Sequence, residues 1–215
     1  MYYCAQCKKT TCRTDGEDYP KTCPTLEGEK LEEIKKMYKD PLDGKVAYHA
    51  AKTEKEGYGR LTRVEETIMF FKKMEVKKVG LAFCGGLMEE GKILADILTK
   101  NGFTVSSVMC KNGSIEKSFM GLEKSDYLKP DTREVMCNPI GQAEFLNSQE
   151  TDYNLLLGLC VGHDSLFLKH SKALVTVIGV KDRVLCHNPV AALYQADKYY
   201  KDKLYPPTDK KEEDS

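Results

Sequence analysis

The chain has 215 residues, of which 41% are apolar and 31% are charged, a composition typical of a globular protein with one sizeable domain and a small appendage. Lysine plus arginine and aspartate plus glutamate number 33 each, so there is no electrostatic reason to expect nucleic acid or a membrane surface as a partner. No apolar run approaches the length of a transmembrane helix, and the first residues do not resemble a signal peptide, so we expect a cytoplasmic protein.

Four of the nine cysteines lie within the first 23 residues, in the spacing C-x2-C-x4-C-x10-C. They are Cys4, Cys7, Cys12 and Cys23. In a reducing compartment, cysteines this close together are more often metal ligands than disulfides. Residues 1–25 contain almost no aliphatic side chains, so a bound metal would have to supply the cross-links that order them. We therefore predict that residues 1–25 form a metal-binding arm.

The metal is expected to be zinc or an iron–sulfur cluster, because both bind four thiolates. The wide gap between Cys12 and Cys23 differs from the paired knuckles of a zinc ribbon, whereas a proline after the last cysteine is common among ferredoxin ligands. A closed four-sulfur zinc site has no open coordination position, so it would stabilise the arm rather than catalyse a reaction. The spacing leaves both metals open.

Residues 26–205 are predicted to form an α/β domain, followed by a disordered charged tail at 206–215. Periodicity predicts helices at 26–39, 46–54, 61–74, 87–101, 138–146, 164–171 and 190–204, and strands at 79–83, 103–109, 154–159 and 173–180. The polar stretch 111–134 predicts a long surface excursion. Strands that alternate with helices indicate a parallel Rossmann-like or flavodoxin-like sheet of about four or more strands, with helices on both faces.

Cysteines also mark the ends of the predicted strands. Three of them follow a strand directly, and a fourth precedes a helix, so all four should converge on the carboxyl edge of the sheet, where ligands bind. The segment Gly158–Asp164 adds an imidazole and a carboxylate to the same edge. The candidate catalytic residues are therefore Cys84, Cys110, Cys137, Cys160, His163 and Asp164.

These edge residues admit several interpretations. The thiols could hold a second metal or iron–sulfur cluster, or one thiol could be a nucleophile with His163 as its base. Helix N-termini and Lys111 could instead bind a small anionic ligand. The structural alternative is that the cysteines only fill space beside the sheet. Nearby, Asp182 and Arg183 could contact a ligand on the same edge, but we expect them to form a solvent-facing ion pair, and we expect His187 to stabilise a turn.

Several segments resemble a known prokaryotic family. They are the N-terminal cysteine spacing, Met136–Ile140, Thr151-Asp152, Gly158–Asp164, Val180–Val184 and His187–Pro189. Together they resemble domain-of-unknown-function family 1847, whose members are usually labelled metal-binding proteins. The resemblance implies a metal at the four N-terminal cysteines and no assigned reaction. The family pattern has a glycine where this chain has Cys186, which implies that Cys186 is incidental.

Two functional hypotheses follow from these features. The first is a metal-binding protein, either of unassigned reaction or acting as a redox or sulfur-handling enzyme, with zinc or an iron–sulfur cluster in the arm and a cysteine-lined site at the sheet edge. The second is a non-catalytic sensor or binding module, with structural zinc in the arm and a small anionic ligand at the sheet edge.

Overall fold

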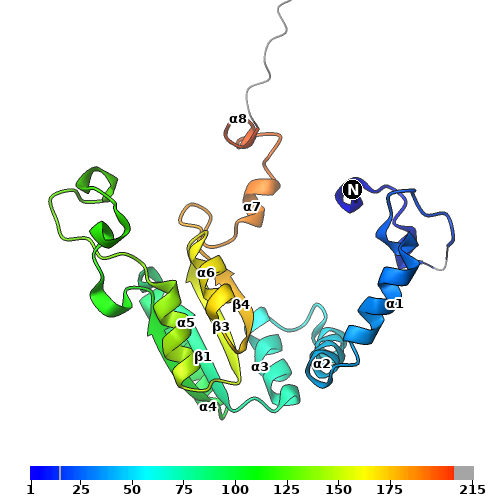
Figure 1. The fold of residues 1–215 in the computed structure, drawn as a ribbon, viewed down its shortest axis with the longest axis horizontal. Helices are drawn as coiled ribbons and strands as arrows, with labels where there is room; N and C mark the ends of the chain where they lie inside the picture. The colour runs from blue at the N-terminus through cyan, green and yellow to red at the C-terminus, as the bar shows by residue number, and fades with distance from the viewer. Residues whose placement is uncertain (15, 206–215) are drawn as a thin grey trace, which may run out of the picture. The chain divides into compact units, whose positions relative to one another are not determined.

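The computed structural model describes residues 1–14 and 16–205, and the chain divides into two compact units, Met1–Met74 and Glu75–Ser215 (Figure 1). The tail predicted to be disordered, 206–215, lies outside the described residues. None of the helices within the described ranges is long and apolar enough to cross a membrane.

The first unit contains three short 3-10 turns and three helices. The turns are η1 (Cys4–Gln6), η2 (Thr11–Arg13) and η3 (Pro24–Leu26), and the helices are α1 (Gly28–Met37), α2 (Pro41–Gly57) and α3 (Arg63–Met74). The three predicted helices are confirmed, but α2 begins five residues earlier than expected. Asp40 caps it by accepting hydrogen bonds from the amides of Leu42 and Asp43, and Pro41 suits the first helical turn. Helices α2 and α3 pack against each other.

The second unit is built on a four-stranded parallel sheet. Its strands are β1 (Lys78–Phe83), β2 (Thr104–Met109), β3 (Tyr153–Leu159) and β4 (Leu174–Val180), in the spatial order β2-β1-β3-β4. The predicted α/β class is confirmed. The chain runs from β1 outward to β2 and then crosses to β3 on the other side, so the strand order reverses between β1 and β3. Ligands bind at such a switch point in open parallel sheets.

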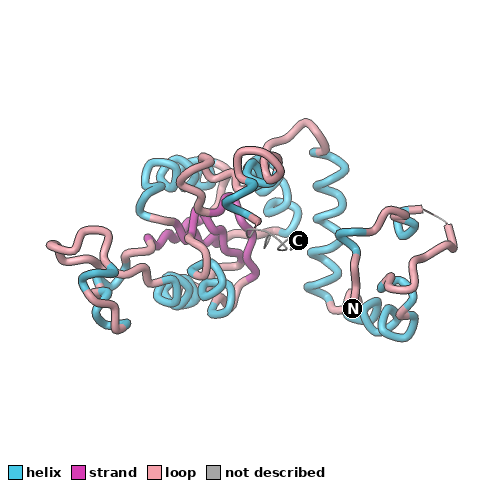
Figure 2. The backbone as a smooth tube through the Cα atoms, turned by 90° about the horizontal axis from the view of Figure 1, so that it is seen from above, coloured by secondary structure: helices cyan, strands magenta, loops and turns pink. Residues whose placement is uncertain are grey.

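Helices cover both faces of this sheet (Figures 1 and 2). Helix α4 (Met88–Lys100) packs against β1 and β2, and α5 (Pro139–Ser148) packs against the same strands and against α6 (His163–His170). All seven residues of β3 are buried, as expected for a central strand with both faces covered. A hydrophobic cluster joins the sheet to α5 and α6, and its buried members are Ala82, Ala143, Leu146, Leu156, Leu159 and Phe167.

The prediction of one helix over 190–204 is wrong. The structure has two single turns there, α7 (Val190–Leu193) and α8 (Lys201–Leu204). No residue between 190 and 205 is buried. Because most helices in proteins are stabilised by burying an apolar face, the helical spacing of tyrosines here is not enough to maintain a continuous helix.

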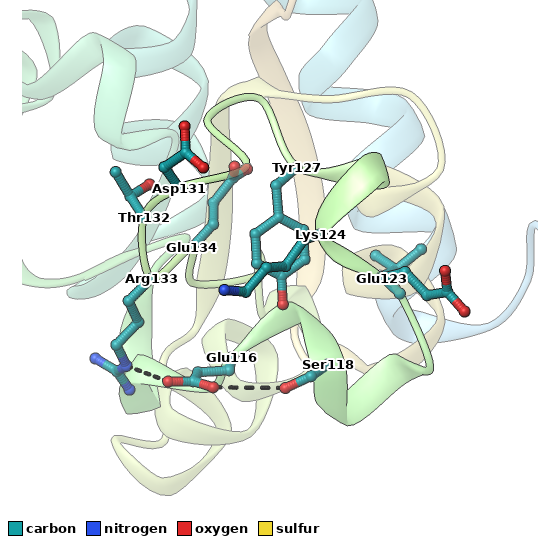
Figure 3. A pocket seen from close by; sticks show the side chains of 10 residues that line it. Glu116, Ser118, Glu123, Lys124, Tyr127, Asp131, Thr132, Arg133 and Glu134 are labelled. Carbon is teal, nitrogen blue, oxygen red and sulfur yellow. Dashed lines mark hydrogen bonds and ion pairs between the residues drawn. The ribbon is translucent and has the colours of Figure 1, made fainter.

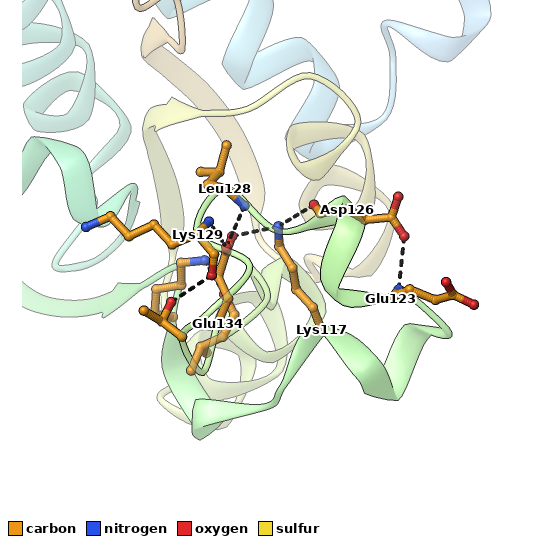
Figure 4. Close-up of polar contacts among 9 residues, drawn as sticks. Lys117, Glu123, Asp126, Leu128, Lys129 and Glu134 are labelled. Atoms are coloured by element: carbon orange, nitrogen blue, oxygen red, sulfur yellow. Dashed lines mark hydrogen bonds and ion pairs between the residues drawn. The ribbon is translucent and has the colours of Figure 1, made fainter.

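The predicted excursion between β2 and α5 contains only short 3-10 turns, η5 (Asn112–Ser114), η6 (Lys117–Met120) and η7 (Lys124–Asp126). An isolated β-bridge between Glu116 and Val135 closes it. Its side chains line an open pocket of about 590 Å³ (Figure 3). Beside the pocket, the Lys117 amine lies 2.6 Å from the Glu134 carboxylate, which also accepts hydrogen bonds from two backbone amides (Figure 4). These contacts stabilise the excursion without a hydrophobic core.

Candidate thiol site at the sheet edge

The fold brings Cys84, Cys110, Cys137 and Cys160 to the carboxyl edge of the sheet, and we call these four residues the thiol site. Cys84, Cys110 and Cys160 directly follow β1, β2 and β3, and Cys137 precedes α5. The backbone holds them in place: the Cys110 amide donates to the Phe83 carbonyl at 2.9 Å, and the Cys110 carbonyl accepts from the Asn138 amide at 2.7 Å. Cys84 and Cys110 are buried, whereas Cys137 and Cys160 are half-buried.

Cys110 interacts with the thiols of Cys84 and Cys137. Hydrogen bonding with Cys110 lowers the pKa of Cys137 to about 7, and the positive charge of Lys111 contributes in the same direction against the effect of burial. The same interaction, together with burial, raises the pKa of Cys110. Near neutral pH, Cys137 is therefore the thiol of this pair that ionises, and Cys110 keeps its proton.

Backbone amides and a guanidinium also point at the sulfur atoms. The Gly85 amide donates to Cys110 Sγ at 3.3 Å, and the Gly86 amide donates to Cys84 Sγ at 3.5 Å. The Arg183 guanidinium donates to Cys160 Sγ at 3.3 Å, and this contact raises the pKa of Arg183. Hydrogen-bond donors therefore contact three of the four sulfur atoms.

Gln142 holds the ends of β1 and β2 together beneath the thiol site. Its side chain is fully buried in α5, and its amide nitrogen donates to the carbonyls of Phe83 at 3.1 Å and Val108 at 2.7 Å. At the start of the same helix, Asn138 accepts from the Gly141 amide at 2.9 Å, as its predicted role of N-cap requires. These two contacts fix the turn that carries Cys137.

Gly158 allows the end of β3, which carries Cys160, to lie close to Leu87. Its φ of 67° suits glycine, and a Cβ added there would stand 2.1 Å from Leu87 Cδ1. The register between β3 and β4 shifts between Leu156 and Leu157 and again between Leu157 and Leu159, across Gly158, which marks a bulge. A larger residue at this position would displace Leu87 or the end of β3, and with it Cys160.

The loop after β4 does not form the expected ion pair between Asp182 and Arg183. Asp182 Oδ1 instead accepts from the amides of Val184 and Leu185, and the Asp182 amide donates to His187 Nδ1 at 3.1 Å. Asp182 and His187 therefore stabilise the turn, as expected for His187, and the turn leaves Arg183 free to reach Cys160.

His163 and Asp164 lie at the start of α6, beside the thiol site in the chain. Burial and the charge of Lys111 lower the pKa of His163. Within the described ranges, no hydrogen bond joins its ring to any of the four thiols. Asp164 accepts a hydrogen bond from the Ser165 amide at 2.8 Å. The role of His163 as a base for a nucleophilic thiol thus stays a prediction, and the hydrogen-bonded partner of Cys137 is another thiol.

The four N-terminal cysteines are surface residues. Cys4 and Cys12 are exposed and Cys7 and Cys23 are half-buried, and the Cys7 amide donates to the Cys4 carbonyl at 3.1 Å within the η1 turn. Across the described part of the chain, no three potential ligands from histidine, cysteine, aspartate and glutamate are gathered tightly enough to hold a metal ion. The metal ligands therefore stay a prediction.

Sequence reasoning did not single out Lys181. If Gly86 or Gly158 carried a Cβ, the Lys181 amine would lie 3.6 Å from it, so this amine sits beside both glycines at the switch point. Its position in the sequence could have indicated it, because Lys181 directly follows β4 just as the cysteines follow their strands.

The fold and the site together define an α/β protein with four cysteines at the carboxyl edge of a parallel sheet, beside its switch point. Residues 23–178 match the sequence model of a family described as protein of unknown function (DUF1847), and the chain belongs to this family, as its motifs indicated. It is also similar to "Uncharacterized protein MJ0455" of Methanocaldococcus jannaschii, with 47% identity over 201 residues that cover 94% of this chain and 97% of the relative. The range 23–178 contains the whole thiol site, but Cys4, Cys7 and Cys12 lie outside it.

Proposed function

We propose that this protein is a redox or sulfur-handling enzyme that works through the thiol site. The observation that carries this proposal is the meeting of four cysteines at the carboxyl edge of the sheet, where the Cys110 carbonyl accepts from the amide of Asn138, the residue after Cys137. The lowered pKa of Cys137 beside a second thiol whose pKa is raised supports it, because thiol–disulfide exchange pairs an attacking thiolate with a second thiol.

The reaction can be written from these two residues. The Cys137 thiolate attacks one sulfur of a disulfide, a new S–S bond forms, and the other sulfur leaves as a thiolate with the electron pair. The Cys110 sulfur then attacks Cys137, and its proton passes to the second leaving thiol. The protein ends with a Cys110–Cys137 disulfide, and two electrons have passed to the substrate.

Exchange with a neutral disulfide tests this proposal. Reduced protein is treated with bis(2-hydroxyethyl) disulfide at pH 7, and its disulfides are mapped by peptide mass spectrometry. The Cys110–Cys137 disulfide should form first, and Cys110→Ser should instead trap a mixed disulfide on Cys137. Cys186→Ser, which changes an exposed cysteine outside the site, should behave like the unchanged protein. Disulfides that form with no preference for this pair would contradict an enzymatic role and favour a non-catalytic binding module.

A second proposal concerns the arm, in which Cys4, Cys7, Cys12 and Cys23 would bind zinc or an iron–sulfur cluster. It is supported by the absence of a core there, since no described residue before Thr53 is buried. The thiolate donors suit either metal. A metal held by these residues would cross-link a segment that buries no apolar side chain.

Metal analysis of protein purified without oxygen tests the second proposal. Brown protein with broad visible absorption would indicate an iron–sulfur cluster, and colourless protein with one equivalent of zinc would indicate a structural site. Cys4→Ser combined with Cys7→Ser should remove the metal, whereas Cys84→Ser combined with Cys160→Ser should retain it. Metal that follows the second pair instead would place it at the sheet edge and contradict the assignment to the arm.

A further inference from the structure

Three cations surround the thiol site. The Lys111 amine donates to the Val135 carbonyl, the Arg183 guanidinium contacts Cys160 Sγ, and the Lys181 amine lies beside Gly86 and Gly158. No described carboxylate forms an ion pair with any of the three cations. The region therefore carries positive charge that no carboxylate among the described residues neutralises.

The carboxylates nearest in the sequence are engaged elsewhere. Asp164 accepts from the Ser165 amide, and Asp182 accepts from two amides of its own turn. Two more donors point into the site, because the amides of Gly85 and Gly86 reach sulfur atoms. Positive side chains and backbone amides at the switch point of a parallel sheet are the ordinary means of binding an anion.

The thiolate restricts which anion could react there. A negatively charged sulfur repels an anionic substrate, so attack by Cys137 on an anion needs cations to offset that repulsion. A neutral disulfide would not need them. The site combines a thiolate with lysine and arginine side chains that no described carboxylate neutralises. It therefore suits an anion that itself contains an electrophilic sulfur.

We infer that the substrate of the thiol site is a small anion with a sulfane sulfur, of the thiosulfate or inorganic polysulfide class. This inference rests on the proposed function and adds the substrate. Lys181 and Arg183 bind the anion, Cys137 is the nucleophile, and Cys110 completes the reaction.

The reaction with thiosulfate balances as follows. The Cys137 thiolate attacks the outer sulfur of thiosulfate, the S–S bond to the sulfonate breaks, and sulfite leaves with the electron pair. Cys137 then carries a persulfide. Cys110 attacks the sulfur of Cys137, the outer sulfur leaves with the electron pair and takes the Cys110 proton to become hydrosulfide, and the Cys110–Cys137 disulfide forms. With a polysulfide, the leaving group in the first step is the shortened polysulfide anion.

Single-turnover reactions test the inference with two probes, sodium thiosulfate and sodium tetrasulfide. Released sulfite is measured in the first arm, and the Cys137 persulfide is detected by mass spectrometry in both, with Cys110→Ser used to stop the reaction at that stage. We expect one equivalent of sulfite or a stoichiometric persulfide. Transfer from thiosulfate alone, from tetrasulfide alone or from both identifies the anion and supports the inference.

Charge variants separate anion binding from thiol reactivity. Lys181→Gln and Arg183→Gln should each slow sulfur transfer roughly tenfold or more, because each removes a charge-assisted contact. Both should leave the rate with bis(2-hydroxyethyl) disulfide within about twofold, since charged side chains bind that neutral probe weakly. Arg133→Gln, which removes a guanidinium paired with Glu116 in the excursion, is the matched control and should change neither rate.

The outcomes distinguish this inference about the substrate from the proposed redox function on which it rests. If neither anion transfers sulfur while the neutral disulfide still yields the Cys110–Cys137 disulfide, the substrate assignment is overturned and the redox function stands. If the neutral disulfide also fails, the proposed function falls with it. Equal losses for anionic and neutral probes in the Lys181 and Arg183 variants would show that these residues act on the thiols and not on the anion, which also overturns the inference.

Discussion

The arm and the sheet edge each contain four cysteines, but the fold treats the two sets differently. The arm cysteines are close in sequence and lie at the surface, in a segment where no described side chain is buried. The edge cysteines are spread over 77 positions from Cys84 to Cys160, yet β1, β2, β3 and α5 bring them to one edge, where three of their sulfur atoms accept hydrogen bonds.

This difference indicates two ways of using thiols. In the arm, ligand binding would have to supply the order that packing does not, so the free energy of metal binding and that of folding should be coupled. At the edge, the sheet positions the thiols first, and their hydrogen bonds then determine which one is ionised. The arm is thus expected to depend on a metal and the edge to depend on the fold.

The largest expected effect is that of metal removal on the arm. Structural thiolate sites can contribute on the order of 10 kcal/mol to folding, so chelation should speed proteolytic cleavage within the first 25 residues at least about 100-fold. The measurement is limited proteolysis followed by mass spectrometry, with and without chelator. Cleavage within the sheet should not change, because the sheet contains the hydrophobic core. An arm that resists the protease equally well without metal would remove the basis for the coupling.

A smaller effect is expected from Gln142→Leu in the sheet unit. The leucine is similar in size, but it removes the side-chain donor to the Val108 carbonyl, whereas the Phe83 carbonyl keeps its hydrogen bond from the Cys110 amide. The free energy of unfolding should fall by about 1–3 kcal/mol, measured by urea denaturation. Gln149→Leu provides the matched control, since Gln149 is exposed at the other end of α5, and its effect should stay within about 0.5 kcal/mol. Equal stability in both variants would mean that Gln142 does not hold the strand ends.

The smallest expected effect is that of Arg183→Gln on Cys160. The guanidinium is exposed, so its single contact with the sulfur should affect the reactivity of Cys160 only modestly. Alkylation of Cys160 by iodoacetamide at pH 7 should slow about two- to threefold, as followed by mass spectrometry of its peptide. Arg133→Gln should leave this rate unchanged. A faster reaction of Cys160 in the Arg183 variant would show that the side chain shields the sulfur instead of activating it.

Much of the sheet could be predicted from the sequence, because buried parallel strands read as short apolar runs. The run at 79–83 and the Cys-Asn-Pro helix start at 137–139 match β1 and the capped start of α5 closely. The placement of cysteines after strands also predicted a common edge. The helix over 190–204 was wrong because its spacing was helical but no surface buries it.

The polar contacts of the site could not be predicted in the same way. That Cys137 bonds to Cys110 depends on side-chain directions at the ends of two elements, which periodicity does not encode. Arg183 was expected to pair with its neighbour Asp182, but the turn uses that carboxylate for backbone amides and leaves the guanidinium for Cys160. Which hydrogen-bond partner each side chain takes depends on the folded backbone.

The pH dependence of Cys137 alkylation tests the central claim most directly. A thiol becomes reactive as pH rises through its pKa, so the iodoacetamide rate at Cys137 should reach half its maximum at about pH 7. In Cys110→Ala, which lacks the hydrogen-bond donor, the midpoint should move up toward the ordinary value of 9.0. The rate at pH 7 should then fall about five- to tenfold, because a more basic thiolate is a better nucleophile and partly offsets its lower abundance. A midpoint near 9 in the unchanged protein, or the same midpoint in both proteins, would contradict the account.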